Sequence, residues 1–272
     1  MNIPARQSSR VSLTPLVLCL VAASPAWADT TIPQTIRCLQ TAYPNHICAV
    51  QPNALVWCDG TVMPFEDGRQ PSDHTDRLAN PDLADQMHQR YSEETSPDWR
   101  PATNDDPGRI RFEPFFRKMY GDTKKKAAST LTTVRWLPKS ANRRLRVTTV
   151  NNVHTKLQAV SDAIEKLPLR IRKKMAKTAG GFHWRRIRKT SRTSMHSFGI
   201  AVDVGMGHAD FWRWRGRSRD GTLRYRNRLP MEVVRIFEQQ GFIWGGRWYH
   251  FDTMHFEYRP ELLVPACMRR DG

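Results

Sequence analysis

Two short segments near the C-terminal end of the chain alternate apolar and polar side chains with the two-residue period of a β-strand. The segments are residues 199–204 and 254–258, with apolar positions at Ile200, Val202, Val204, Met254, Phe256 and Tyr258. Asp203 lies on the opposite face of the first segment, and His255 and Glu257 lie on that of the second. If both strands belong to one sheet, Asp203 and His255 point to the same side. Gly199, just before the first strand, permits a tight bend that brings His196 back over that side.

Two longer segments repeat apolar residues at the three- and four-residue steps of an amphipathic helix. The first covers residues 151–167 and ends before Pro168, which cannot continue a helix. The second begins at Pro230, a favourable first helical position, and stops at Gly241. Residues 83–91 and 115–120 are shorter candidate helices, and residues 103–108 are typical of turns.

Helices and short strands follow one another without a regular βαβ rhythm. This order predicts the α+β class, with a small, mainly antiparallel sheet and helices packed on one side. The composition changes near residue 145. Residues 29–145 are rich in Pro, Asp and Asn but keep several tryptophans, which predicts an N-terminal wrapping region that packs on a domain formed by residues 146–272.

Residues 1–28 have the three parts of a secretory signal peptide. Arg6 and Arg10 precede a mostly apolar run over residues 11–23, which an Ala-Trp-Ala cleavage site follows. We therefore predict cleavage after Ala28 and export of the mature chain. A membrane anchor is the alternative, but the apolar run is short for a bilayer, and no transmembrane segment is expected in the mature chain.

Four cysteines remain after removal of the signal peptide: Cys38, Cys48, Cys58 and Cys267. An even number in an exported chain indicates two disulfides, and four cysteines allow three pairings. We favour a local Cys48–Cys58 bridge and a Cys38–Cys267 bridge that ties the ends together. Free buried thiols are an alternative, whereas the missing C-x-x-C pairs disfavour a zinc ribbon.

Residues on and beside the two predicted strands form a pattern typical of a hydrolytic metal site. His196, Asp203 and His255 offer nitrogen and oxygen ligands, and Asp252 precedes the last of them by three residues. Proteins build catalytic zinc sites from three such ligands and an open fourth position, where bound water ionises near neutral pH. A nearby carboxylate must then accept and return the proton. Because an isolated histidine is more often structural, spacing alone leaves both interpretations open.

These residues resemble the motifs of the zinc D-alanyl-D-alanine carboxypeptidase / L-alanyl-D-glutamate endopeptidase family. That family has the pattern S-x-H-x-x-G-x-A-x-D followed by [ED]-x-x-H, and every specified position is filled here. The matching residues are Ser194, His196, Gly199, Ala201, Asp203, Asp252 and His255. The resemblance extends over about residues 151–262, and it implies the hedgehog/DD-peptidase-like version of the α+β fold, with the zinc peptidase in residues 146–272.

By this resemblance, His196, Asp203 and His255 bind one zinc ion per chain, and Asp252 is the general base. Arg185 lies in a segment similar to the family's strand with a substrate-binding arginine. It is therefore expected to act in catalysis by binding a substrate carboxylate, for which a planar guanidinium is well suited.

Three nearby residues have two interpretations each. Ser194 either binds the substrate or caps the turn before His196. Glu257 either orients a metal ligand or faces solvent. His250 either assists the tetrahedral intermediate or has a structural role.

The chain is strongly basic, with a formal charge of +17 at pH 7, and such a surface attracts anionic partners. Residues 211–228 interleave seven arginines with Trp212, Trp214 and Tyr225. Similar compositions bind nucleic acid, but an exported protein rarely meets it, so we predict no nucleic-acid partner. We favour an anionic cell-wall polymer, with a solvated basic loop as the plain alternative.

The resemblance implies an exported zinc metallopeptidase of the periplasm or cell envelope that hydrolyses peptidoglycan stem peptides. Removal of a terminal D-alanine, the D-alanyl-D-alanine carboxypeptidase reaction, is the favoured activity. L-alanyl-D-glutamate endopeptidase activity on the same substrate is the alternative, which the aspartate at position 252 favours. A non-catalytic cell-wall binding protein on this scaffold is the third interpretation, but the complete ligand set argues against it.

Overall fold

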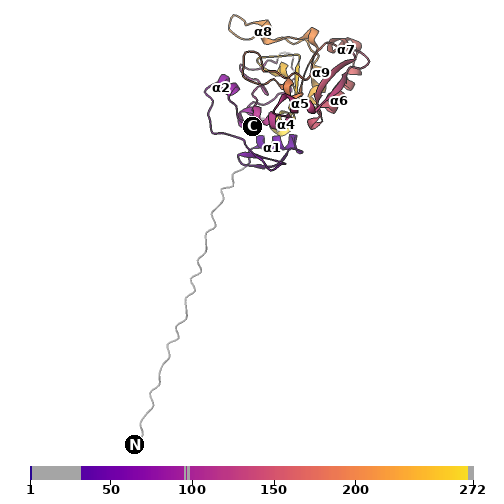
Figure 1. Ribbon diagram of the computed structural model, residues 1–272. Coiled ribbons are helices and arrows are strands. Elements are labelled where there is room, and N and C mark those ends of the chain that lie inside the picture. Colours follow the sequence, from indigo (N-terminus) through magenta and orange to yellow (C-terminus); the bar gives the residue numbers. More distant parts are fainter. Residues whose placement is uncertain (2–31, 95, 97–98, 269–272) are drawn as a thin grey trace. The chain divides into compact units, whose positions relative to one another are not determined.

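The computed structural model describes residues 1, 32–94, 96 and 99–268. The described residues from Ile32 to Met268 form one compact unit (Figure 1). The predicted signal peptide, apart from Met1, lies outside the described residues. Over the described ranges, no helix has both the length and the apolar character needed to cross a membrane.

The strands form three small sheets in the described part of the chain. The first contains β1 (Ile47–Gln51), β2 (Ala54–Trp57) and β3 (Val62–Pro64), and the second is the hairpin of β4 (Leu131–Trp136) and β5 (Arg143–Thr148). The third has the order β6 (Thr178–Gly180), β7 (Ala201–Val204), β9 (His255–Tyr258) and β8 (Phe242–Trp244). Every strand pair within these sheets is antiparallel. The strands predicted at residues 199–204 and 254–258 are β7 and β9, and they are neighbours.

Helices of varied length connect and cover these sheets. The α-helices are α1 (Gln34–Ala42), α2 (His74–Ala79), α3 (Leu83–Gln86), α4 (Glu113–Tyr120), α5 (Lys124–Ser129), α6 (Val153–Glu165), α7 (Leu169–Met175), α8 (Trp212–Arg215), α9 (Met231–Glu238) and α10 (Pro265–Met268). Short 3-10 helices are η1 (Val150–Asn152), η2 (Met195–Phe198), η3 (Met206–His208), η4 (Gly245–Arg247) and η5 (Pro260–Leu262). Helices and antiparallel sheets in this arrangement confirm the predicted α+β class.

The two helices predicted from apolar periodicity are α6 and α9. They contact each other, and α6 also packs on β4 and β5 while α9 packs on β8 (Figure 1). The residues that α6 buries are Val153, Leu157, Val160, Ser161 and Ile164. From α9, Phe237 stacks on Phe256 of β9 with ring centroids 3.8 Å apart. The apolar stripe of α9 therefore supports the sheet that carries the predicted metal motif, and the stripe of α6 supports the β4–β5 hairpin and α9.

The candidate helix over residues 83–91 is shorter than predicted. α3 begins with a capping box between Asp82 and Asp85 and ends at Gln86. Farther on, the hydroxyl of Tyr91 donates to Glu238 Oε1 (2.7 Å) and accepts from the backbone N–H of Trp244 (2.9 Å). These long-range hydrogen bonds hold the chain in another conformation, which local periodicity does not reveal. The candidate helix over residues 115–120 is present as α4.

The β4–β5 hairpin was not predicted from the sequence, and the expected boundary near residue 145 falls inside β5. The hairpin connects directly to the metal motif, because the N–H of Thr148 donates to the carbonyl of Gly199 (3.0 Å). The carbonyl of Arg146 accepts a hydrogen bond from the N–H of Phe182 (2.8 Å). The hairpin thus contacts both the motif and the segment that precedes it.

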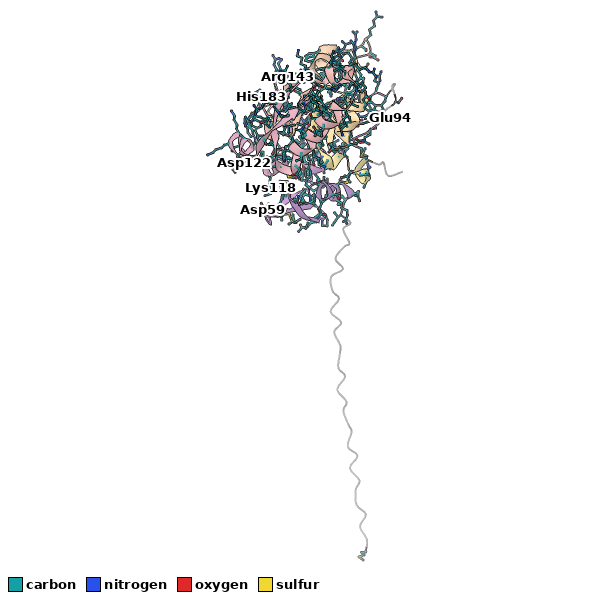
Figure 2. All side chains as sticks on the ribbon, turned by 90° about the vertical axis from the view of Figure 1, so that its right-hand side faces the viewer. Asp59, Glu94, Lys118, Asp122, Arg143 and His183 are labelled. Atoms are coloured by element: carbon teal, nitrogen blue, oxygen red, sulfur yellow. A yellow bond between two sulfur atoms is a disulfide. The ribbon has the colours of Figure 1, made fainter. Side chains whose placement is uncertain are left out.

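Covalent and polar contacts join the first part of the compact unit to its last part. The structure contains the Cys38–Cys267 and Cys48–Cys58 disulfides, which confirms the favoured pairing. The hydroxyl of Tyr43 donates to Glu261 Oε2 (2.6 Å), and both residues are buried. On the surface, Lys118 of α4 forms an ion pair with Asp59 (2.7 Å), and Figure 2 shows the two labelled residues next to each other.

Candidate metal centre

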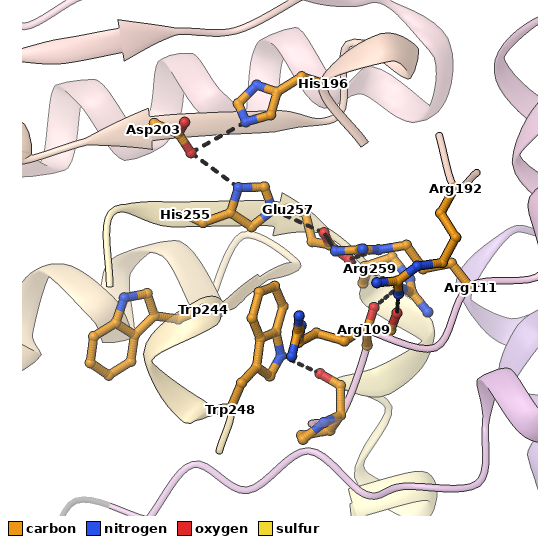
Figure 3. A network of polar contacts seen from close by, with 12 residues as sticks. Arg109, Arg111, Arg192, His196, Asp203, Trp244, Trp248, His255, Glu257 and Arg259 are labelled. Atoms are coloured by element: carbon orange, nitrogen blue, oxygen red, sulfur yellow. Dashed lines mark hydrogen bonds and ion pairs between the residues drawn. The ribbon is translucent and has the colours of Figure 1, made fainter. Parts of the chain in front are cut away.

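The register between β7 and β9 places Asp203 directly opposite His255. Asp203 Oδ1 lies 3.0 Å from His255 Nδ1 and 3.2 Å from His196 Nε2 (Figure 3). One ligand atom from each of the three residues lies within 4.8 Å of the others. Both histidines are buried and Asp203 is half-buried. The structure therefore brings together the three expected metal ligands, which we call the metal cluster.

His196 reaches this cluster because the chain turns sharply at Gly199. η2 carries His196 and is followed by the C-cap residue Gly199, whose φ of 68° lies in the left-handed region. The N–H of Gly199 donates to the carbonyl of His196 at 3.1 Å. A Cβ at this position would lie 2.9 Å from the backbone nitrogen of Thr148, a contact that a larger residue cannot relieve without moving the β4–β5 hairpin. The bend expected from the sequence is present.

The outer nitrogens of both histidines already have hydrogen-bond partners. His196 Nδ1 lies 2.7 Å from the carbonyl oxygen of Gly181, and His255 Nε2 lies 3.0 Å from Glu257 Oε2. Both partners accept hydrogen bonds, so in a neutral ring the nitrogen that faces Asp203 carries a lone pair. Two lone pairs and a carboxylate oxygen then face one another, which is favourable only with a cation or a proton between them. The donor set therefore fits a metal cation.

The charges of the cluster shift the pKa values of its members. Burial alone would raise the pKa of Asp203, but His196 and His255 hold it well below its usual range. Burial alone would lower the pKa of His255, but hydrogen bonds to Asp203 and Glu257 raise it to about 10. A metal ion held by His255 Nδ1 would displace the proton from that nitrogen, so its binding would release a proton.

Glu257 is fully buried and orients His255, so it does not face solvent. Arg111 contacts both of its carboxylate oxygens (3.3 Å to Oε1 and 2.6 Å to Oε2), and Arg259 contacts Oε1 at 3.0 Å (Figure 3). Although burial opposes ionisation, Arg111, His255 and Arg259 hold the pKa of Glu257 well below its usual range. An ionised Glu257 keeps the proton of His255 on Nε2 and so turns Nδ1 toward Asp203.

Asp252 lies close enough to the metal cluster for the charges of His255, Asp203 and His196 to affect its pKa. Its backbone N–H donates to the carbonyl of Gly245 (2.9 Å), and its carbonyl accepts from the N–H of His255 (3.1 Å). The side chain is half-buried, and its Oδ1 atom is buried without a hydrogen-bond partner in the described residues. Burial, reinforced by the negative charge of Asp203, raises the pKa of Asp252 to about 6. This carboxylate is suited to accept a proton near neutral pH.

Arg185 and Ser194, which precede His196 in the sequence, differ in their exposure to solvent: Arg185 is exposed and Ser194 is buried. Arg185 has an exposed side chain, and its backbone N–H and carbonyl both bond to the buried hydroxyl of Ser197 (2.8 and 3.0 Å). Ser194 is buried at the N-cap position of η2, but its hydroxyl makes no capping hydrogen bond. No described side-chain contact joins the Arg185 guanidinium to the metal cluster.

Three other guanidinium groups gather beside the cluster instead, which we call the arginine group: Arg109, Arg111 and Arg192 (Figure 3). Arg109 and Arg111 each lie 5.7 Å from the ring of Trp248, whose other neighbour is the His255 ring at 5.6 Å. Burial and the positive charges of Arg111 and Arg109 lower the pKa of Arg192 to about 10. Arg111 is neutralised by Glu257, whereas Arg192 has no ion pair among the described residues. Arg109 also has an acidic partner, Asp106, at 3.3 Å, so Arg192 is the member of the group that lacks one among the described residues.

A second set of ligand-type residues consists of His74, Asp106 and His250. Asp106 is fully buried, and its Oδ2 lies 2.7 Å from His250 Nδ1, 3.2 Å from His74 Nε2 and 3.3 Å from Arg109 Nη1. Because the Arg109 guanidinium already supplies a cation to this oxygen, we interpret the set as a hydrogen-bonded network. His250 is thus held by Asp106, and its ring packs against Trp212 (4.8 Å).

Sequence reasoning missed the contribution of residues 106–111 to this region. The turn predicted over residues 103–108 does exist: Gly108 has φ 93°, and a Cβ there would lie 2.3 Å from Ile243. Arg109 and Arg111 come directly after this turn, but Arg111 meets Glu257 of β9, and Arg109 meets the ring of Trp248, only through the tertiary fold. The alternation of two arginines around buried Ile110 was the one available signal.

Comparison with known proteins bears on the segment that contains the metal cluster. Residues 188–258 match the family model described as D-alanyl-D-alanine carboxypeptidase. This match includes all three residues of the cluster and Asp252, and it confirms the resemblance predicted from the motifs. A comparison with curated proteins found no match.

Proposed function

Because residues 188–258 match the D-alanyl-D-alanine carboxypeptidase family model, we propose that this protein is an exported zinc metallopeptidase that hydrolyses peptidoglycan stem peptides. The observation that carries the proposal is the donor set of the metal cluster. Two histidine nitrogens and one carboxylate oxygen face one another while Gly181 and Glu257 occupy the outer nitrogens.

We propose that His196 Nε2, Asp203 Oδ1 and His255 Nδ1 hold one zinc ion. Three ligands of this kind suit zinc and leave a coordination position for substrate or water. When bound, zinc supplies a Lewis acid that polarises the scissile carbonyl and makes water more acidic.

Asp252 is the proposed general base. Its carboxylate accepts a proton from the attacking water as the new bond to the carbonyl carbon forms. The protonated carboxyl then gives this proton to the leaving amine as the peptide bond breaks, so that Asp252 returns to its ionised form. The raised pKa of about 6 suits both steps, because neither form of the carboxyl is strongly favoured near neutral pH.

We propose that Arg192, with Arg109, receives the substrate carboxylate next to the cut bond. Arg192 is half-buried, lacks an ion pair in the described residues and lies among other guanidiniums whose repulsion an anion would relieve. Arg185, which the resemblance assigns to this task, is the alternative and could reach the substrate only from its exposed position. Ser194 is a further proposed substrate contact, because its hydroxyl makes no capping bond.

The description of the matching family favours removal of a terminal D-alanine over the endopeptidase reaction. An anion site beside the cluster suits a substrate in which the residue after the cut bond is the last one and carries the free carboxylate. Export is supported by the two disulfides, which form and persist in oxidising compartments such as the periplasm. A complete donor set together with Asp252 argues against a protein that only binds the cell wall.

The test is mass spectrometry of stem peptides and muropeptides after incubation with the zinc-loaded protein, with a chelator-treated control. Zinc-dependent loss of one D-alanine supports the carboxypeptidase, and release of the L-alanine side of the stem identifies the endopeptidase. Intact substrates in the presence of protein with one bound zinc would overturn the enzymatic proposal.

A further inference from the structure

The basic segment between the two metal motifs forms a hairpin that projects from the compact unit and carries α8 (Figure 1). We call residues 211–228 the arginine hairpin. Its tip is closed by the bridge between Arg217 and Leu223, and Asp220 accepts from the N–H and hydroxyl of Thr222 (3.0 and 2.7 Å) within that tip. The hairpin is therefore a formed element with its own hydrogen bonds.

The base of the hairpin is attached to the residue proposed as the general base. Phe211 forms an antiparallel bridge with Asp252, and the N–H of Trp212 donates to the carbonyl of Phe251 (2.9 Å). On the returning side, the hydroxyl of Tyr225 donates to the carbonyl of Gly246 (2.9 Å). A polymer that presents a peptide bond to Asp252 must consequently pass beside this hairpin.

Most of the hairpin's charge is unpaired. Its only acidic residue, Asp220, is used within the tip, and Arg215 and Arg228 pair with buried Asp210 at 4.0 and 2.8 Å. The remaining arginines are exposed and have no acidic partner among the described residues: Arg213, Arg217, Arg219, Arg224 and Arg226. Such a row of guanidiniums attracts a chain of carboxylates over several ångströms and can bind each one with two hydrogen bonds.

An exposed aromatic side chain accompanies these charges. Trp214 has 64% of its surface exposed and contacts the ring of Phe211 at 5.5 Å. A large apolar side chain held in solvent beside unpaired arginines is typical of an interaction surface, since burying it elsewhere would stabilise the isolated protein.

We propose that the arginine hairpin binds the carboxylate-bearing peptidoglycan polymer next to the stem peptide being cut, and so makes the enzyme act on polymer in preference to free peptide. The identity of the polymer rests on the proposed function, whereas the surface itself rests on the exposed charges and Trp214. Phosphate polymers such as DNA, and anionic lipid surfaces, are less favoured because the hairpin's base leads directly to a peptidase centre.

The test compares two variants of equal charge. In the hairpin variant, Arg213, Arg217, Arg219, Arg224 and Arg226 are replaced by Gln. In the control variant, five exposed basic residues elsewhere are replaced by Gln: Lys124, Lys125, Lys139, Arg143 and Arg144. Binding to purified sacculi is measured by co-sedimentation across salt concentrations, and hydrolysis is measured for both sacculi and a soluble stem peptide.

The hairpin variant is expected to bind sacculi about tenfold more weakly, with a flatter salt dependence, and to show a KM for sacculi raised by a similar factor. Its kcat/KM for the soluble peptide should stay within about twofold of the unmodified protein, and the control variant should behave like the unmodified protein. Replacing Trp214 by Ala should weaken sacculus binding without changing the salt dependence.

Equal sacculus binding by the hairpin and control variants would overturn the inference and leave a solvated loop. So would a hairpin variant that loses binding to DNA or to phosphatidylglycerol vesicles while still binding sacculi normally. A third result separates the two proposals. If the unmodified protein cuts no stem peptide, and the hairpin variant but not the control variant binds sacculi more weakly, the proposed activity is wrong and the proposed binding surface is supported.

Discussion

Asp252 is held in a position that is unfavourable for an ionised carboxylate, and its proposed role explains why. Its Oδ1 atom is buried without a partner in the described residues, and its pKa is raised. Replacing Asp252 by Asn keeps the shape and removes the proton acceptor. We expect kcat to fall by about a hundredfold to ten-thousandfold while zinc content stays at one per chain. Metal analysis alongside turnover separates this result from loss of the metal, which would remove Asp252 from the role of base.

The raised pKa of Asp252 also predicts that this residue lowers the free energy of unfolding of the chelator-treated protein, by an amount that depends on pH. A folded-state pKa of about 6 lies above the unfolded value, so folding is penalised once the pH exceeds both values. Asp252→Asn should therefore stabilise the protein by up to about 3 kcal/mol above pH 6, and this gain should disappear as the pH falls below 4. Thermal unfolding of both proteins between pH 4 and 8 measures it, and a gain that is constant with pH would contradict the assignment.

Two arginines make competing predictions about substrate binding. Arg192→Gln should raise KM for a stem peptide by about tenfold or more, because it removes the proposed partner of the substrate carboxylate, a guanidinium without an ion pair among the described residues. Arg185→Gln removes an exposed side chain and should change KM by less than about threefold. A free carboxylate is needed for this contrast, so a substrate with an amidated C-terminus should bind both variants and the unmodified protein alike. The opposite ranking would return the carboxylate to Arg185.

Residues of the metal cluster could be predicted because their chemistry is local. Two of them lie on strands with clear alternation, and a glycine fits the bend that carries the third. Arg109 and Arg111 could not be predicted in the same way. They reach Glu257 and Trp248 from more than a hundred residues away in sequence, and neither periodicity nor spacing carries that information.

The turn between η2 and β7 is the element on which the cluster depends most directly. Gly199→Ala places a Cβ against the backbone nitrogen of Thr148 and forces a non-glycine residue into the left-handed region. We expect a loss of about 2 kcal/mol or more in unfolding free energy and weaker zinc binding, because His196 would move with the turn. Gly207→Ala is the matched control, since no atom lies within 4 Å of its added Cβ. Equal effects of the two substitutions would show that the turn has no special role.

Among the elements, those with a continuous pattern were predicted well and those that depend on partners were not. α6 and α9 each bury one regular apolar stripe, and both end near the predicted Pro or Gly. The β4–β5 hairpin also alternates: Val134 and Trp136 of β4 and Leu145 and Val147 of β5 are all buried, and Val134 pairs with Leu145. This alternation was not recognised from the sequence, because exposed arginines occupy several of the other positions of the two strands.

At the scale of the whole molecule, a chain of buried hydrogen bonds links the first helix to the metal cluster. Tyr43, at the end of α1, donates to Glu261, which pairs with Arg259 at 2.5 Å. Arg259 contacts Glu257, and Glu257 accepts from His255. These contacts make α1 part of the support of the cluster, although residues 29–145 were expected only to wrap around the catalytic domain.

The two disulfides should therefore contribute unequally to stability and to metal binding. Cys38–Cys267 joins residues 229 positions apart beside this chain of hydrogen bonds, whereas Cys48–Cys58 closes a separation of 10. Loop entropy predicts a loss of about 5 kcal/mol when the first bridge is removed and about 3 kcal/mol for the second. Denaturant unfolding of Cys38→Ala/Cys267→Ala and of Cys48→Ala/Cys58→Ala measures the difference, and zinc titration of both variants measures its effect on the cluster. Removal of the Cys38–Cys267 bridge should weaken zinc binding, because α1 is then no longer tied to the segment that carries Glu261. Removal of the Cys48–Cys58 bridge should leave the contact between Tyr43 and Glu261 intact. If both variants unfold at the same denaturant concentration and bind zinc equally, the ends of the chain are held by packing alone, and the proposed link between α1 and the metal cluster is wrong.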